Sequence, residues 1–154
     1  MERKTMPHYP DFEYLKKLAL VAGNIIVENF KLGMTGYVWK DDNTTLTKTD
    51  TGINDMVVAM ITKDFPHISV AGEEGAGAAQ KSEYFVVCDP VDGTMCFTAG
   101  IPLSTFCITV VKNGLPIVAI IYDAFQERMW HAEKGGGAWE NEKRITVSPH
   151  ATIK

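Results

Sequence analysis

Apolar residues recur at steps of three and four between residues 11 and 30, and this spacing predicts an amphipathic helix packed on a core. Pro10 and Asp11 supply the signals for its start. A similar pattern over about residues 52–65 predicts a second helix, which Pro66 ends. Each helix has a single apolar side, so both are expected to cover the same core.

After Pro66 the apolar period becomes that of β-strands, which are expected at residues 68–71, 84–88, 105–111, 115–122 and 128–132. Asn113-Gly114 lies between two of these runs and predicts a two-residue hairpin turn. Residues 37–49 alternate loosely and favour a ragged hairpin or a loop. Strands joined by short connections pair antiparallel. The expected fold class is therefore α+β, with two N-terminal helices packed on a mainly antiparallel sheet in a single domain over residues 1–154.

Composition and charge narrow the class of protein. The 154 residues are 45% apolar and 22% charged, which suits one folded domain and excludes a disordered or fibrous chain. Fifteen Lys and Arg against nineteen Asp and Glu give a net charge of −4, so nucleic acid is not an expected partner. No run approaches the roughly 18 apolar residues of a membrane helix. The three cysteines, interpreted as buried thiols, suit a reducing compartment, and a cytoplasmic protein is expected.

Acidic residues follow several of the predicted strands, namely Asp50, Glu73, Glu74, Asp89 and Asp92. Carboxylates that converge from separate strand ends repel one another, so protons or cations must neutralise them. These motifs contain no His or Cys ligand pattern that would favour zinc. Oxygen-only ligation indicates Mg²⁺ or a similar hard cation.

The segment Asp-Pro-Val-Asp-Gly-Thr at residues 89–94 is the most informative part of the sequence. Asp89 and Asp92 are three positions apart and can turn to the same side at the end of a strand. Gly93 permits close backbone approach, and free N–H groups at Gly93 and Thr94 would hold a phosphate oxygen. A dication beside a phosphate cradle is what hydrolysis of a phosphate ester requires.

Each acidic group also has a purely structural interpretation. Asp50 could be the N-cap of the second helix. The adjacent Glu73 and Glu74 could form a solvated turn, and Asp89 and Asp92 could belong to an ordinary β-turn. Their occurrence together favours metal ligation.

Three motifs occur in order along the chain: Leu-Thr-Lys-Thr-Asp at residues 46–50, Gly-Glu-Glu at 72–74, and the segment at 89–94. With them the chain resembles the N-terminal part of the inositol monophosphatase family. This superfamily of Mg²⁺-dependent, lithium-sensitive phosphatases also includes fructose-1,6-bisphosphatases and bisphosphate nucleotidases. The resemblance implies the first half of the sugar phosphatase fold, with the C-terminal α/β half of the family absent.

The resemblance also implies a ligand set for Mg²⁺, of which the family binds two or three ions. Glu73, Asp89 and the backbone carbonyl of Val91 would hold the first ion, and Asp89 with Asp92 the second. The second site would be incomplete here, because the Trp-Asp motif that supplies another carboxylate belongs to the absent half.

Catalytic and substrate-binding roles follow from the same resemblance. Asp50, hydrogen-bonded to Thr94, would activate the metal-bound water, and Glu73 would help to place that water. Asp92, Gly93 and Thr94 would contact the substrate, the last two through their N–H groups.

The expected function is hydrolysis of a phosphate monoester on a small polyol or sugar, such as inositol 1-phosphate. Fructose-1,6-bisphosphatase and 3′(2′),5′-bisphosphate nucleotidase activities are alternatives, because Met95 and Cys96 match neither the usual inositol-directed nor the nucleotide-directed continuation. A further alternative is a truncated, non-catalytic metal- or phosphate-binding domain, or a regulatory or assembly module. The missing half would leave an apolar sheet face exposed, which favours a homodimer or association with a complementary C-terminal half.

Overall fold

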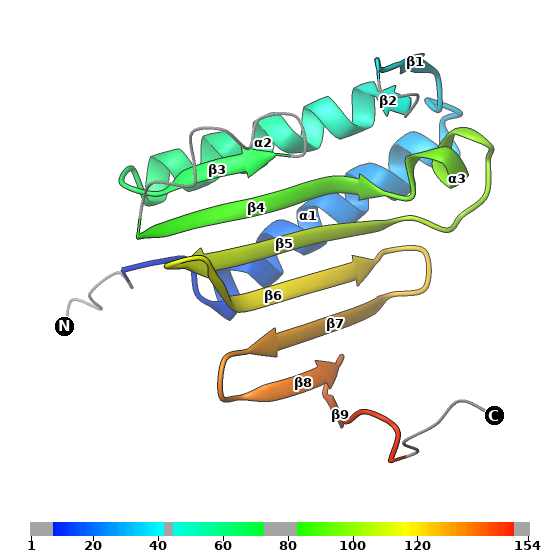
Figure 1. The fold of residues 1–154 in the computed structure, drawn as a ribbon. Coiled ribbons are helices and arrows are strands. Elements are labelled where there is room, and N and C mark those ends of the chain that lie inside the picture. The colour runs from blue at the N-terminus through cyan, green and yellow to red at the C-terminus, as the bar shows by residue number, and fades with distance from the viewer. Residues whose placement is uncertain (1–7, 42–44, 73–82, 150–154) are drawn as a thin grey trace, which may run out of the picture.

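Two helices lie against one face of a long sheet in the computed structural model, which describes residues 8–41, 45–72 and 83–149 (Figure 1). In chain order the elements are α1 (Phe12–Lys31), β1 (Tyr37–Trp39), β2 (Thr45–Thr47), α2 (Lys48–Asp64), β3 (Ser69–Gly72), β4 (Tyr84–Asp92), α3 (Thr94–Thr98), β5 (Thr105–Lys112), β6 (Leu115–Asp123), β7 (Arg128–Glu133), β8 (Gly137–Glu140) and β9 (Lys143–Ile145). The predicted α+β class is confirmed.

The main sheet has seven strands in the order β3-β4-β5-β6-β7-β8-β9, and β1 pairs with β2 in a separate antiparallel hairpin. All neighbours in the main sheet are antiparallel except β3 and β4, which are parallel. The predicted mainly antiparallel sheet is thus confirmed, and among the described strands β3 and β4 form a parallel exception that the sequence pattern did not predict. Residues 73–83 separate the two strands, and this connection is longer than the tight turn that joins an antiparallel hairpin.

The main helices begin at side-chain caps. Asp11 is the N-cap of α1 and accepts a hydrogen bond from the backbone N–H of Tyr14 at 2.9 Å. Helix α2 begins at Lys48, four positions before the predicted start, because Thr47 caps it. Helix α1 packs on β5 and β6, and α2 packs on β3 and β4.

The core lies between the helices and the sheet. Its fully buried members come from both layers and include Leu15, Leu18, Ile26, Ile53, Ile61, Val86, Ile108 and Ile120. On the opposite face of the sheet Val87 and Ile121 are 40% and 45% exposed. No helix in the described part of the chain covers that face (Figure 1).

A tight turn joins β5 to β6, and the three cysteines differ in exposure. Asn113 and Gly114 have φ values of 50° and 78°, which confirms the predicted hairpin turn between β5 and β6. Of the three cysteines, Cys88 is buried, but Cys96 and Cys107 are partly exposed, so the expectation of three buried thiols was wrong. No helix among the described residues is long and apolar enough to cross a membrane.

Candidate active site

The C-terminal end of β4 carries a β-bulge. Asp89 lies opposite Cys107 of β5, whereas Asp92 lies opposite Thr105, so the β4 side has one extra residue. Residues three apart on a regular strand point to opposite faces. Here Asp89 and Asp92 both line one pocket of about 300 Å³, together with Thr45, Val91, Gly93, Thr94 and Met95.

Gly93 shapes the turn that follows the bulge. Its φ of 91° lies in the left-handed region, and a Cβ at this position would come within 2.9 Å of the Leu103 carbonyl oxygen. Helix α3 begins directly afterwards at Thr94. The N–H groups at the start of a helix have no partner within the helix, so the turn can present donors to an anion.

Asp50 reaches the same site from α2. Thr47 and Asp50 form a capping box, in which the Thr47 backbone N–H donates to Asp50 Oδ2 at 2.9 Å and the Thr47 hydroxyl donates to the same oxygen. The Thr94 hydroxyl lies 3.3 Å from Asp50 Oδ1 and 2.8 Å from the Val91 carbonyl oxygen. The alternative that Asp50 is the N-cap was wrong, since it occupies the third helical position.

Burial sets the electrostatics of Asp50. Its side chain is almost fully enclosed, and this loss of solvation raises the pKa of its carboxyl. The hydrogen bonds from Thr47, from the Asp50 backbone and from Thr94 favour the charged form and oppose that shift. Asp50 is thus a more basic carboxylate than one in water, while two threonines fix its orientation.

The donors around the pocket fit a hard cation. Asp89 and Asp92 supply carboxylate oxygens, and the Val91 carbonyl keeps a second lone pair beside the one that accepts from Thr94. Cys107 Sγ lies 3.8 Å from Asp92 Oδ2, but burial raises the pKa of this thiol to about 11. The thiol therefore stays protonated at neutral pH, and soft sulfur is not a ligand that a hard cation prefers.

The predicted site is brought together only in part. Asp50, Asp89, Val91, Asp92, Gly93 and Thr94 gather at the end of β4. Glu73, expected as a metal ligand and catalytic residue, lies outside the described residues. Among the described residues no group of three or more His, Cys, Asp or Glu side chains is arranged to hold a metal.

Two threonines contribute to the site without having been predicted. Thr47 holds Asp50, and the spacing Thr-x-x-Asp of a capping box was readable in the sequence. The Thr45 hydroxyl is buried at the pocket wall with no hydrogen-bond partner among the described residues. Because buried hydroxyls are normally paired, the Thr45 hydroxyl is a candidate contact for a polar group in the pocket. No sequence pattern marks Thr45.

Known proteins similar to this chain include a fructose-1,6-bisphosphatase/inositol-1-monophosphatase of Aquifex aeolicus, 32% identical over 92% of this chain and 54% of that protein. Inositol monophosphatase 1 of Sus scrofa is 29% identical over 92% of this chain and 52% of its own length. A Nus factor SuhB of Xylella fastidiosa is 29% identical over 90% and 50%.

Solved structures show the same likeness. An IMPase of Thermotoga maritima superimposes with a TM-score of 0.82 at 28% identity, covering 92% of this chain and 55% of that one. This chain therefore spans about half the length of the relatives that it matches. The sequence profile of the inositol monophosphatase family matches residues 10–154. With that match over nearly the whole sequence, the chain belongs to the inositol monophosphatase family.

Proposed function

We propose that the chain takes part in metal-dependent hydrolysis of a phosphate monoester on a small polyol or sugar. The observation that carries the proposal is the convergence of three elements at the end of β4, two of them lining one pocket and the third contacting Thr94 beside it. The bulged end of β4 supplies Asp89 and Asp92, the turn into α3 supplies Gly93 and Thr94, and the start of α2 supplies Asp50.

In this proposal Asp89, Asp92 and the Val91 carbonyl hold Mg²⁺, with Glu73 completing the set. A bound dication would polarise the phosphate and lower the pKa of a bound water. The two described carboxylates would be neutralised by the cation, which offsets the repulsion between them. Asp92 is also fixed from β5, because the Thr105 hydroxyl lies 3.3 Å from its Oδ2.

In this proposal Thr94 and Asp50 accept the proton that the attacking water loses. The Thr94 hydroxyl has one hydrogen, and its shorter contact is to the Val91 carbonyl at 2.8 Å. When that hydrogen turns to Asp50 Oδ1, the Thr94 oxygen can accept a hydrogen bond from the attacking water and the carboxylate can take the proton. Burial of Asp50 favours this step, since it raises the affinity of the carboxylate for a proton.

The phosphate lies, in the same proposal, at the turn between β4 and α3. The N–H groups of Gly93 and Thr94 would donate to its oxygens, and the Thr45 hydroxyl is a further polar contact at the pocket wall. The pocket, about 300 Å³, suits a small phosphorylated molecule. Met95 lines the pocket as well, so an apolar side chain borders the place proposed for the phosphorylated molecule.

Inositol 1-phosphate is the proposed substrate type because relatives named as inositol monophosphatases match most of the chain. Fructose 1,6-bisphosphate remains a candidate for the same reason. Phosphate release with and without Mg²⁺ should be measured on these two compounds and on adenosine 3′,5′-bisphosphate. The expected result is Mg²⁺-dependent turnover of at least one of them.

Asp89→Asn is the test variant for this assay, and Asp55→Asn is its matched control, since Asp55 is an exposed carboxylate on α2 away from the pocket. Asp89→Asn should abolish phosphate release and weaken Mg²⁺ binding in calorimetry, while Asp55→Asn leaves both unchanged. Equal phosphate release by Asp89→Asn and the unmodified chain would contradict the proposal.

The uncovered sheet face favours a second role, association with another chain. Val87 and Ile121 on this face are substantially exposed, and such apolar surface commonly marks an interface. A homodimer and a complex with a complementary C-terminal half both fit this surface. Sedimentation equilibrium of the chain alone and of Ile121→Lys shows whether each is a homodimer or a monomer, and the same measurement with a complementary half added shows whether a complex forms. Loss of a dimer in the variant supports the homodimer, and a monomer that binds no complementary half contradicts the role.

A further inference from the structure

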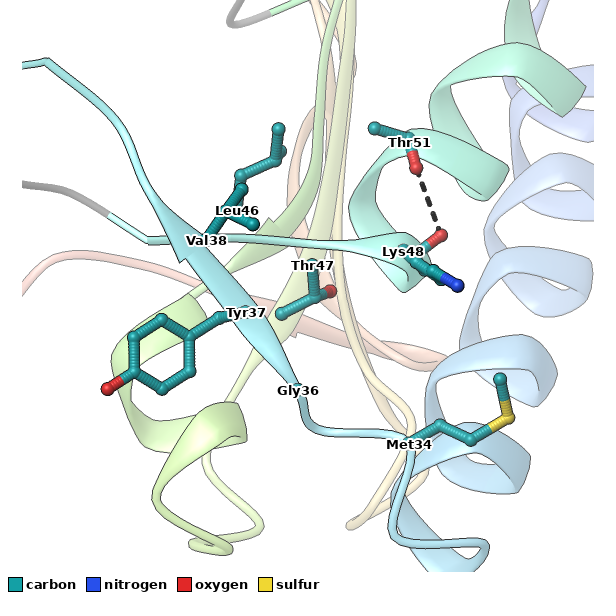
Figure 2. Close-up of a pocket in the computed structure, with 8 residues that line it drawn as sticks. All are labelled: Met34, Gly36, Tyr37, Val38, Leu46, Thr47, Lys48 and Thr51. Atoms are coloured by element: carbon teal, nitrogen blue, oxygen red, sulfur yellow. Dashed lines mark hydrogen bonds between the residues drawn. The ribbon is translucent and has the colours of Figure 1, made fainter.

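A second pocket, larger than the acidic one, lies where the β1–β2 hairpin meets the first turn of α2 (Figure 2). Its volume is about 500 Å³, within the range of pockets that bind small molecules. It is lined by Met34, Gly36, Tyr37, Val38, Leu46, Thr47, Lys48 and Thr51. Asp89 and Asp92 do not line it, so it is distinct from the candidate active site.

The large apolar side chains that line this pocket are substantially exposed to solvent. Met34, Tyr37 and Val38 are 46%, 47% and 63% exposed. Val38 pairs with Leu46 across the hairpin, so these two side chains form a continuous apolar wall. Large apolar side chains gathered around a concave surface indicate a place where another apolar group is buried.

The charge of the pocket indicates the chemistry of the polar end of a bound apolar ligand. Lys48, at the first position of α2, is exposed and carries the charge among the lining residues, none of which is acidic. The nearby Asp50 carboxylate is directed to Thr47 and Thr94 instead. Thr51 adds a hydroxyl, which donates to the Lys48 carbonyl oxygen at 3.2 Å and keeps its lone pairs. An ammonium group on the α2 side of the pocket and an apolar wall on its hairpin side together complement an anion that carries an apolar tail.

We propose that this pocket binds a small amphipathic anion, an aliphatic carboxylate being the simplest case. The tail would lie against Val38 and Leu46, and the carboxylate would pair with Lys48. Thr47 links this pocket to the candidate active site, because Thr47 lines the pocket and its backbone N–H also donates to the Asp50 carboxylate. A ligand in this pocket would therefore lie next to Thr47, which is hydrogen-bonded to the proposed catalytic carboxylate.

Titration with octanoate, followed by amide chemical shifts, tests the proposal, and 1-octanol is the uncharged control of equal tail length. Octanoate should shift the amides of Gly36, Val38 and Thr51 and should bind about two- to five-fold more tightly than octanol, the range for one exposed ion pair. Shifts confined to Val87 and Ile121 would place the ligand on the uncovered sheet face and overturn the proposal.

Two variants separate the roles of charge and tail. Lys48→Gln should remove the preference for octanoate over octanol, and Lys48→Arg should retain it, whereas Lys63→Gln makes the same charge change at the other end of α2 and should have no effect. Val38→Glu should weaken octanoate binding through repulsion, and Val147→Glu is the exposed control. Octanoate binding unchanged in both Lys48→Gln and Val38→Glu would overturn the proposal.

Discussion

The two faces of the main sheet differ sharply, although the same strands make both. Ile120 and Ile121 are neighbours on β6, yet Ile120 is 1% exposed beneath the helices and Ile121 is 45% exposed on the other side. Strand alternation thus divides one apolar sequence into a packed core and an open surface. Hydrophobicity along these strands therefore predicts burial only where a helix covers the face.

The largest effect should come from truncating the two isoleucines separately. Ile120→Ala should lower the free energy of unfolding by about 2–5 kcal/mol, because it leaves a cavity beneath the helices. Ile121→Ala should cost about 1 kcal/mol or less in the monomeric chain, since solvent already reaches that side chain there. Urea unfolding of the two variants measures the difference, and equal losses would mean that the outer face is covered in solution.

The two glycines within the main helices also contrast a packed position with an open one, with a smaller expected change in the free energy of unfolding. A Cβ on Gly23 would collide with the Tyr122 ring and come within 2.7 Å of the Ala124 Cβ, whereas one on Gly52 would meet nothing within 4 Å. Gly23→Ala should therefore destabilise by about 1–3 kcal/mol. Gly52→Ala should stabilise by about 0.5–1 kcal/mol through helix propensity. Thermal unfolding compares them, and a stabilising Gly23→Ala would show that α1 packs less closely on β6 than the structure indicates.

Two cysteines on opposite faces provide the mildest probe, which leaves stability unchanged. Cys88 lies on the helix side and Cys107 on the open side. The raised pKa of Cys107, about 11, predicts that its alkylation by iodoacetamide is slow at pH 7 and rises about tenfold per pH unit towards pH 11, as the thiolate fraction grows. Cys88 should stay unreactive while the chain is folded. Mass spectrometry of the modified peptides reads both rates, and faster labelling of Cys88 would reverse the assignment of the two faces.

Local patterns in the sequence predicted most of the helices and strands of this fold. The periods of three to four and of two placed both long helices and five strands, and Asn113-Gly114 placed the hairpin. The parallel pairing of β3 with β4 was missed, since pairing direction depends on the route of the connecting chain rather than on side-chain alternation.

The candidate site was predictable in its residues but less so in its geometry. The motif at residues 89–94 identified the acids, whereas the bulge that brings Asp89 and Asp92 to one pocket depends on the register with β5. Thr45 was missed because its buried hydroxyl becomes informative only after its surroundings are known. Tertiary contacts, not composition, determine both features.

The order of the main sheet favours its assembly during synthesis of the chain. From β4 to β9 every strand pairs with the one that precedes it in the sequence. As synthesis proceeds from the N-terminus, each new strand emerges when its partner and the helices α1 and α2 are already available. Such local pairing keeps the loops that must close short, which favours fast folding. The described strands of this sheet can thus pair one after another as each emerges from the ribosome.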